Sequence, residues 1–402
     1  MRYDIAVIGA GPAGMTAALE ALRLAPELNV LVIEKNAEAG KKLRATGSGR
    51  CNITNTGAEG YDEARVFLER LGIALRIYDN GLVYPYSESA ADVAELFADR
   101  MEECGVELLY NACVNKVERN ASGFAISYET KVDGITSTFI VEAGRLVLAC
   151  GGKSGPGFGT TGDGYRWARE LGHKVISPIP VLTSVECEKQ GCENLGGNRA
   201  RGEVSLWKDG EKIFAEAGEI QFTRYGLSGI CVFNMTRFMR SGSRDLSMFE
   251  IKLDLYEGYI RAFLGLRREE EQKRVATYKQ GETAESLLRS VLKEAIARYV
   301  LERADVDREL LIAELSDEEL DRVAACVHGP SFRPSAVKGW KDAQCTSGGV
   351  ALEEFDEATC ESKLVPGMYV VGELADYDGP CGGYNLTYAW ISGMKAGRAI
   401  AE

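Results

Sequence analysis

The chain has 402 residues, 45% of them hydrophobic and 27% charged, with a formal net charge of −13. The length predicts two or three domains, and the charge argues against non-specific binding to nucleic acid or to anionic membranes. Eleven cysteines without a C-x-x-C pair and only two histidines argue against a disulfide framework and a metal site, and favour a cytoplasmic protein with free thiols. The chain has no run of eighteen apolar residues, so we predict no membrane-spanning segment. The first predicted strand begins by residue 4, so we also predict no signal peptide.

The first elements predict a βαβ unit: a strand at Ile5–Ile8, a helix at Met15–Leu24 and a second strand at Val30–Ile33. Gly9-Ala10-Gly11-Pro12-Ala13-Gly14 joins the first two as a G-x-G-x-x-G motif, and Glu34 ends the second strand. These glycines permit a tight turn, approach of the backbone to a pyrophosphate, and close helix–strand packing. The helix N-terminus attracts phosphate, and the carboxylate is suited to a ribose 2′-OH. The unit predicts a dinucleotide site but does not say which dinucleotide binds.

The next part of the chain predicts mixed structure. A polar, glycine-rich loop covers 40–56, and residues 61–110 look mostly helical with turns near 79–81 and 84–86. Segments 124–129 and 135–141, joined through Asp133-Gly134, predict a hairpin, and 145–150 predicts a buried strand that ends on Gly151-Gly152. A second glycine-dense loop, 155–164, leads into a helix.

Composition shifts predict the domain boundaries. Short extended pieces with turns indicate a β-rich inserted domain over 178–255, together with about 329–334. Helical spacing between Leu287 and Val300, and a capping-box pattern at Ser316–Glu319, indicate a helical insertion over 256–328. The remainder, 1–177 and 335–402, would then form one discontinuous α/β domain that binds the dinucleotide.

The last segment favours FAD over a nicotinamide dinucleotide. A strand, Gly367–Val371, is followed by Gly372-Glu373 and by a helix that opens at Gly383-Tyr384-Asn385-Leu386. Glu373 is suited to a ribityl hydroxyl, and amides of the helix N-terminus are suited to the flavin N1–C2=O edge, where negative charge develops on reduction. The alternative is that these residues only end a strand and turn the chain.

Further motifs resemble a bacterial family of FAD-dependent oxidoreductases, the BaiN-like flavoproteins, labelled aminoacetone oxidases or 3-dehydro-bile-acid Δ4,6-reductases. The resemblance rests on segments at 40–55, 161–164, 346–350 and 361–393. It implies a Rossmann-like, two-dinucleotide-type FAD domain of the α/β class, interrupted by a β-barrel-like domain and a helical domain. It weakens at 222–229, where Arg224 stands at a position that is often His or Asp in the family, and at Cys360, which we interpret as a packing residue.

The candidate site residues follow from these motifs. The predicted cofactor contacts are Gly9, Ala10, Gly11, Pro12, Ala13, Gly14, Glu34, Lys35, Lys42, Ser48, Gly49, Arg50, Cys51, Asn52, Val114, Cys150, Gly151, Gly152, Gly372, Glu373, Gly383, Tyr384, Asn385 and Leu386. Arg50 is suited to a phosphate, whereas Cys51 is read as a small packing residue near the flavin, since no partner cysteine lies nearby in sequence. The catalytic candidates are Tyr225, Arg224 and Lys341; a solvated surface charge is the alternative for Lys341, as for Arg333.

Three functions fit these residues. The first is reduction of an activated C=C bond, such as a 3-oxo-Δ4 bile acid or steroid-like enone, by hydride from flavin N5. The second is FAD-dependent oxidation of a small aminoketone such as aminoacetone. The third is a flavin-binding sensor or an RNA-associated flavoprotein without turnover. We expect a small-molecule substrate, no nucleic-acid or membrane partner, and NADH or NADPH as a possible electron donor; the oligomeric state stays open.

Overall fold

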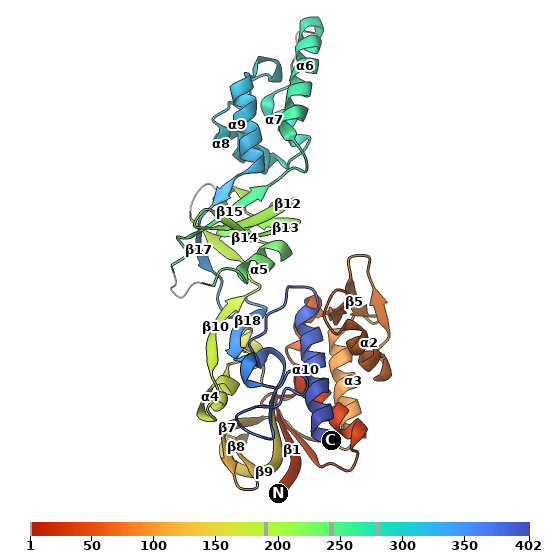
Figure 1. The fold of residues 1–402 in the computed structure, drawn as a ribbon. Helices are drawn as coiled ribbons and strands as arrows, with labels where there is room; N and C mark the ends of the chain where they lie inside the picture. The colour runs from red at the N-terminus through yellow and green to blue at the C-terminus, as the bar shows by residue number, and fades with distance from the viewer. Residues whose placement is uncertain (1, 189–191, 241–244, 279–280) are drawn as a thin grey trace. The chain divides into compact units, whose positions relative to one another are not determined.

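The computed structural model describes residues 2–188, 192–240, 245–278 and 281–402. The chain divides into two compact units, Met1–Pro180 with Ala343–Glu402, and Val181–Asp342. The first unit is made from both ends of the chain, and the second is inserted between them in sequence (Figure 1). The finer domain boundaries proposed above stay predictions.

A seven-stranded sheet forms the centre of the first unit, in the order β6-β2-β1-β9-β8-β7, with β19 paired to β9. Its strands are β1 (Arg2–Ile8), β2 (Val30–Ile33), β6 (Glu107–Leu109), β7 (Ala112–Asn120), β8 (Gly123–Val132), β9 (Ile135–Leu148) and β19 (Met368–Val370). β1 pairs in parallel with β2 and β9, and β19 pairs in parallel with β9. The predicted Rossmann-type α/β fold is confirmed, and the late strand returns to the first sheet.

β9 differs from its prediction. The hairpin strand expected at 135–141 and the buried strand expected at 145–150 are one strand, Ile135–Leu148, and Cys150 lies beyond its end. Residues 142–144, between the two predicted strands, do not turn the chain, because Glu142 pairs with both Ala125 and Arg2 and so continues the ladder.

Two parallel helices lie side by side in this unit, α1 (Pro12–Leu24) and α10 (Tyr384–Ala401). Two glycines permit the close approach: a Cβ at Gly393 would stand 2.5 Å from the Ala13 oxygen, and one at Gly397 would stand 2.7 Å from the Ala17 oxygen. Because the contacts advance in the same order along both helices, α10 begins roughly 12 Å before α1 along their shared direction. The two N-termini therefore lie at different depths at the same end of the unit.

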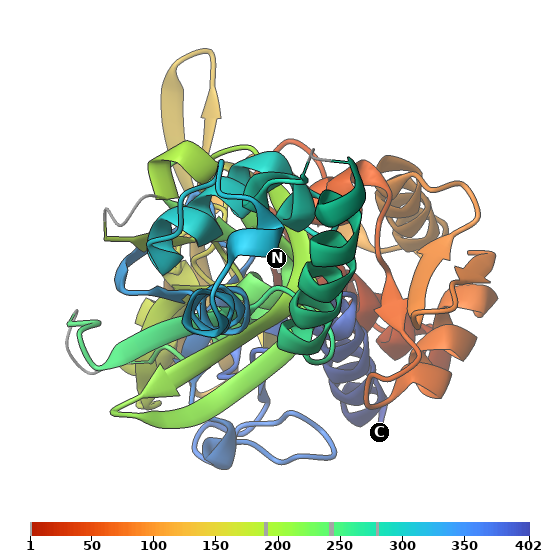
Figure 2. The same cartoon turned by 90° about the horizontal axis from the view of Figure 1, so that it is seen from above.

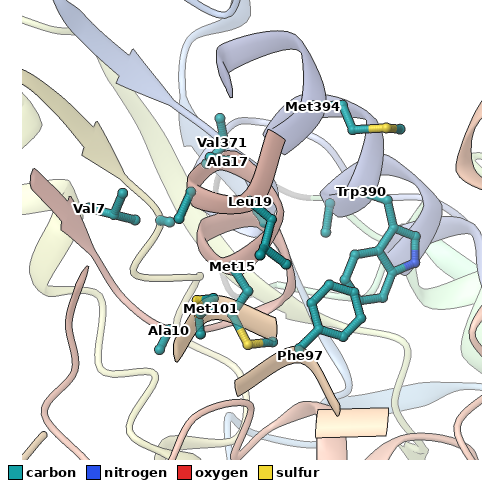
Figure 3. Packing of buried hydrophobic residues seen from close by; sticks show 14 of the residues in the cluster. Val7, Ala10, Met15, Ala17, Leu19, Phe97, Met101, Val371, Trp390 and Met394 are labelled. Carbon is teal, nitrogen blue, oxygen red and sulfur yellow. The ribbon is translucent and has the colours of Figure 1, made fainter. Parts of the chain in front are cut away.

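The core beside these helices is apolar and well packed (Figure 3). Phe97 of α3 (Ala90–Glu103) stacks on Trp390 of α10, with ring centroids 5.2 Å apart. The Trp390 indole N–H also donates to the Ile53 oxygen at 2.9 Å. This hydrogen bond attaches the glycine-rich loop to α10.

The segment 61–110 is helical only toward its ends. It contains α2 (Tyr61–Arg70) and α3, but two strands lie between them, β4 (Leu75–Ile77) and β5 (Leu82–Pro85). These strands form a small sheet, β3-β5-β4, with β3 (Thr54–Asn55), which precedes α2. Gly81, with φ +81°, lies in the turn that makes β4 and β5 a hairpin. The mostly helical expectation was wrong for the centre of this segment.

A second short ladder joins β10 (Val175–Val181) to β18 (Cys345–Val350). The Ala351 N–H donates to the Lys174 oxygen at 3.0 Å, and Gly348 lies against Ser177, so the two strands run antiparallel. The end of β10 and the start of β18 are therefore neighbours, and the chain leaves and re-enters the first unit at adjacent points. α4 (Asp163–Glu170) precedes β10.

The second unit combines an antiparallel sheet with helices. The sheet order is β16-β15-β12-β13-β14-β11-β17. Its strands are β11 (Val185–Cys187), β12 (Arg199–Lys208), β13 (Glu211–Phe222), β14 (Gly226–Ser228), β15 (Phe249–Asp254), β16 (Ser331–Phe332) and β17 (Pro334–Val337), and its helices are α5 (Ile230–Thr236), α6 (Ile260–Tyr278), α7 (Ala284–Arg289), α8 (Glu294–Ala304) and α9 (Asp317–His328). One hydrophobic cluster includes Leu206 and Ile251 of the sheet as well as Ile296 and Val327 of the helices.

Two sequence patterns in this unit are resolved by the structure. The predicted capping box is present at the start of α9, where Ser316 and Glu319 satisfy each other's backbone N–H groups. The helical run from Leu287 to Val300 is two helices, α7 and α8, because the chain turns between Ser290 and Lys293. No helix among the described residues is long and apolar enough to cross a membrane.

Candidate functional site: a cofactor cradle in the first unit

The turn between β1 and α1 forms a cradle of backbone around Gly11. Gly9 has φ +108°, and a Cβ there would stand 2.5 Å from the Ala149 oxygen; one at Gly14 would stand 2.1 Å from the Gly9 oxygen. A Cβ at Gly11, in contrast, meets no atom within 4 Å. Within the described chain, the N–H groups of Gly11, Ala13 and Gly14 donate to no acceptor. Gly9 and Gly14 are therefore required by the protein, whereas Gly11 leaves open space in front of free amides.

Glu34 stands beside this cradle at the end of β2. Its carboxylate accepts from the Ala10 N–H at 2.9 Å, and from the backbone and side-chain N–H groups of Asn36 at 2.8 and 2.7 Å. The Ala112 N–H donates to the Glu34 carbonyl oxygen at 3.0 Å, which places the start of β7, and with it buried Val114, next to Glu34. Three hydrogen bonds fix the carboxylate and leave lone-pair capacity for a further donor such as a ribose hydroxyl.

The Lys35 side chain contacts two other residues of the protein. Its ammonium contacts the Asp163 carboxylate at 2.6 Å and the Thr161 hydroxyl at 2.7 Å. Burial by itself raises the pKa of Asp163, but hydrogen bonds from Lys35 and Thr161 outweigh it and hold that pKa below its usual value. The pair ties the glycine loop near 161 to the end of β2, and a direct cofactor contact by Lys35 stays a prediction.

The loop from 43 to 52 holds several of the predicted cofactor contacts, and these residues differ in exposure. Ser48 and Gly49 are exposed and left-handed, with φ +57° and +85°. Arg50 is exposed, with its guanidinium 5.0 Å from the Tyr84 ring centroid and 3.9 Å from the Glu88 carboxylate. The phosphate contact expected for Arg50 stays a prediction.

Cys51 and Cys150 have the character of packing residues. Cys51 is fully buried, and burial raises the pKa of its thiol to about 12. Burial also raises the pKa of Cys150, to about 12. Both thiols therefore stay protonated at neutral pH, when they are poor nucleophiles.

Glu373 is held by residues from three distant parts of the sequence. The Lys42 ammonium lies 2.6 Å from its carboxylate, and the Thr346 N–H donates to it at 3.0 Å. A Cβ at Gly152 would stand 2.7 Å from the same carboxylate and 2.4 Å from the Thr346 hydroxyl. The loops at Gly152, Thr346 and Gly372 are thus packed into one small polar cluster, to which Lys42 brings a positive charge.

The N-terminus of α10 stands over the loop after Cys51. Gly383 has φ +97°, and a Cβ there would stand 2.4 Å from the Thr54 oxygen. The Asn55 amide donates to the Gly382 oxygen at 2.8 Å, and Asn52 lies close to Gly382. In the described residues no acceptor takes the N–H groups of Tyr384, Asn385 or Leu386, and the first turn holds no acidic side chain. A second set of free amides is therefore available.

Several side chains at this end make contacts that the sequence did not predict. The Asn385 side chain donates to the Gly379 oxygen and accepts from its N–H, both at 2.9 Å, so it fixes the loop before α10. Ser347 donates to Asp378 in the same loop, and Tyr377 stacks on Tyr388 with centroids 3.9 Å apart. The motif at 346–350 was the available signal for Thr346 and Ser347, whereas nothing in the sequence pointed to Asp378.

The three predicted catalytic residues belong to the second unit. Tyr225 lies in the turn between β13 and β14 with 64% of its surface exposed, and the Lys338 ammonium lies 5.2 Å from its ring centroid. Arg224 is exposed and packs against Gly196, and Lys341 is exposed. The structure brings Tyr225 and Arg224 together in one turn, and their catalytic roles stay predictions.

The first unit fits FAD. The open space at Gly11 with its free amides suits a pyrophosphate, and Glu34 suits the adenosine ribose. The free amides of α10, which begins roughly 12 Å before α1 along their shared direction, suit a more distant electron-rich group on the same extended molecule. A nicotinamide dinucleotide alone would leave the role of the second amide set unexplained.

Known proteins share this chain's pattern over its whole length. A family profile described as the HI0933-like protein Rossmann domain matches residues 3–64 and 59–399. A 3-dehydro-bile acid delta(4,6)-reductase of Clostridium scindens is 29% identical and covers 99% of both chains. A ribosomal RNA dihydrouridine synthase of Haemophilus influenzae is 25% identical and covers 98% of both.

A solved structure supports the fold. The 3-ketosteroid-delta4-(5alpha)-dehydrogenase of Rhodococcus jostii, in complex with 4-androstene-3,17-dione, aligns with a TM-score of 0.51 at 15% identity. The alignment covers 100% of this chain and 97% of the other. At this identity the likeness concerns the fold alone.

Proposed function

Since the chain belongs to the HI0933-like family and is an FAD-dependent oxidoreductase, we propose that it reduces a C=C bond conjugated to a carbonyl group, such as a 3-oxo-Δ4 enone. Bound FAD, once reduced, would supply a hydride for the β-carbon of such a bond, and the α-carbon would then take a proton from solvent. The observation that carries the proposal is the full-length likeness to a 3-dehydro-bile acid delta(4,6)-reductase.

The residues of the first unit support this chemistry by binding and orientation. Free amides at Gly11, Ala13 and Gly14 would bind the pyrophosphate, and Glu34 would orient the ribose. The amides of Tyr384, Asn385 and Leu386 would offer positive partial charge to a group that gains electrons on reduction. Lys42 balances the charge of Glu373, so Glu373 would bring no uncompensated negative charge to the predicted cofactor site.

The proposed substrate contacts come from the second unit. Tyr225 would donate a hydrogen bond to the enone carbonyl, where negative charge develops as the β-carbon is attacked. Its exposed side chain, with the Lys338 ammonium 5.2 Å from its ring centroid, supports this role. Arg224 and Lys341 would contact an acidic group elsewhere on the substrate.

A second candidate is reduction of a uracil ring in ribosomal RNA. The likeness to a ribosomal RNA dihydrouridine synthase favours it, and the chemistry is related because the uracil C5=C6 bond is also conjugated to a carbonyl. The net charge of −13 opposes binding to a polyanion. We therefore place the small enone first.

A direct test uses the FAD-loaded protein, reduced without oxygen, and follows the visible flavin absorbance. The expected result is fast reoxidation by a 3-oxo-Δ4 steroid and none by its saturated 3-ketone, the matched control. NADH and NADPH are compared as the source of reducing equivalents in the same experiment.

Other outcomes distinguish the alternatives. Reoxidation by a ribosomal RNA fragment but not by the enone would favour the RNA substrate. Reduction of the oxidised protein by aminoacetone, followed by fast reaction with oxygen and none with the enone, would favour the amine oxidase. Failure of every donor to reduce the bound flavin would favour a sensor.

A further inference from the structure

The hairpin of β8 and β9 carries apolar side chains that the first unit does not cover. Exposure along the hairpin is 67% at Val132, 70% at Ile135 and 45% at Phe139. Figure 2 shows the hairpin as a gold two-stranded ribbon. Apolar residues of this size on a projecting ribbon indicate a surface that binds a partner.

These side chains share one face of the ribbon. Val132 pairs directly with Ile135, and Tyr128 pairs with Phe139, so alternation places all four on the same side. Tyr128 and Phe139 stack with ring centroids 5.5 Å apart. Tyr128 also belongs to the buried cluster on this face of the sheet, so the apolar stripe continues the core outward.

The outer edge of β9 is open beside this stripe. β9 lies between β8 and β1, but β1 pairs with it only from Glu142 onward. Among the strands that the structure describes, none pairs with residues 135–141 on the β1 side. This segment, Ile-Thr-Ser-Thr-Phe-Ile-Val, contains no charge and no proline, which are the usual means by which an edge strand is protected.

The sequence of this edge is nearly symmetric about Ser137. If two copies pair antiparallel about a two-fold axis at Ser137, Ile135 of one copy stands opposite Phe139 of the other. Thr136 then stands opposite Thr138 on the other face, and the two Ser137 residues face each other. Aromatic–β-branched pairs and Thr–Thr pairs are favourable cross-strand neighbours.

We propose that the edge of β9 from Ile135 to Phe139 joins two copies of this chain in an antiparallel, two-fold symmetric sheet. The lack of charge on the edge supports a second copy as the partner, because two chains of net charge −13 can meet there without opposed carboxylates. The contact is a single short strand pair, below the roughly 1,200 Å² that stable interfaces bury. The dimer is therefore weak and forms at high protein concentration.

The test measures dimerisation of the FAD-loaded protein by sedimentation velocity over a concentration series. Ser137→Lys and Ser137→Glu each place like charges opposite one another at the axis, and each is expected to weaken the dimer roughly tenfold or more. An equimolar mixture of the two variants places Lys opposite Glu and is expected to recover the dimer.

Ala121→Lys is the matched control, because residue 121 is exposed in the turn before β8 and outside the edge. It adds the same charge and is expected to dimerise like the unaltered protein. An unaltered protein that stays monomeric at all concentrations contradicts the proposal. So does a dimer that neither Ser137 variant weakens, or a mixture that recovers nothing. Bound flavin absorbance verifies that each variant is folded.

Discussion

At the scale of single residues, the three glycines of the G-x-G-x-x-G motif have different surroundings. Gly9 and Gly14 are required because protein atoms occupy the place of a Cβ, whereas the space in front of Gly11 is open. Glycine is therefore needed for folding at Gly9 and Gly14, and we propose that it serves cofactor binding at Gly11. Substitutions can separate the effect on folding from the effect on cofactor binding.

We expect Gly11→Ala to fold normally but to bind FAD roughly tenfold or more weakly, since its methyl group would fill the space meant for pyrophosphate. Gly14→Ala, the matched variant, is expected to lower the free energy of unfolding by about 1–3 kcal/mol because its Cβ meets the Gly9 oxygen. Denaturant unfolding of the apo-proteins and flavin titration measure the two effects. Equal losses of stability in both variants would contradict this division.

Glu20 gives a second residue-scale prediction. It is buried on α1 and bonded to Arg23 at 2.8 Å and to Arg398 of α10 at 3.0 Å, with Arg70 of α2 at 3.2 Å. Burial by itself raises the pKa of Glu20, but the hydrogen bonds from Arg23 and Arg398 outweigh it and hold the pKa below its usual value. Three helices thus depend on one ionised carboxylate.

Because its folded-state pKa is lowered, Glu20 contributes stability that is fully present above its unfolded pKa, about 4.3, and is lost as the pH falls through the folded value. Glu20→Gln is expected to cost about 1–3 kcal/mol of unfolding free energy at neutral pH. The loss should shrink toward acidic pH. Unfolding free energies measured at several pH values test this, and a difference independent of pH would refute it.

At the scale of elements, the contact between α1 and α10 positions the two sets of free amides. Gly393 and Gly397 set the spacing because larger residues would separate the helices. The register of this contact decides how far apart the amides of Gly11 and Tyr384 lie. The site therefore depends on helix packing as much as on its own loops.

Gly397→Val is accordingly expected to weaken FAD binding roughly tenfold and to lower stability by about 1–3 kcal/mol, although residue 397 is far along α10 from the amides. Ala401→Val, at the end of the same helix, is the control and should change neither quantity. Flavin titration and thermal unfolding measure both. Normal FAD binding by a destabilised Gly397→Val protein would show that helix register does not control the site.

At the scale of the whole molecule, the first unit is assembled from both ends of the chain. β10 and β18 bring together the points at which the chain leaves and re-enters the first unit. β19, from the C-terminal part of the chain, completes the first sheet. The predicted cofactor residues therefore all belong to one unit, while the proposed substrate residues belong to the other. Binding of FAD and turnover should be separable.

We expect a variant with residues 182–342 replaced by a short Gly/Ser linker to keep bound flavin, because the strands on either side of the junction are neighbours. Its enone turnover should fall by at least about 100-fold, since Tyr225, Arg224 and Lys341 are removed. Flavin absorbance and anaerobic reoxidation measure the two properties, with the full chain as the control. Undiminished turnover would place the substrate contacts in the first unit.

Much of this protein could be predicted from its sequence, because many of its features depend on residues that are close together in the chain. The βαβ unit could be predicted from the spacing of Gly9, Gly11, Gly14 and Glu34, because each glycine meets a requirement of its own position: a positive φ at Gly9, open space at Gly11 and close packing at Gly14. The pattern at Ser316 and Glu319 determined a helix start for the same reason. The second predicted cofactor segment, at Glu373 and Gly383, was also marked by local turns and a strand.

Only the tertiary structure decided which partners these residues take. Glu373 binds Lys42, Lys35 binds Asp163, and Arg50 stacks on Tyr84, all through contacts between segments far apart in sequence. β9 became one strand because β1 and β8 supply hydrogen bonds through its polar centre. Turns and caps are set by neighbouring residues, whereas ion pairs and strand ladders are set by which segments meet, and the sequence alone does not contain that geometry.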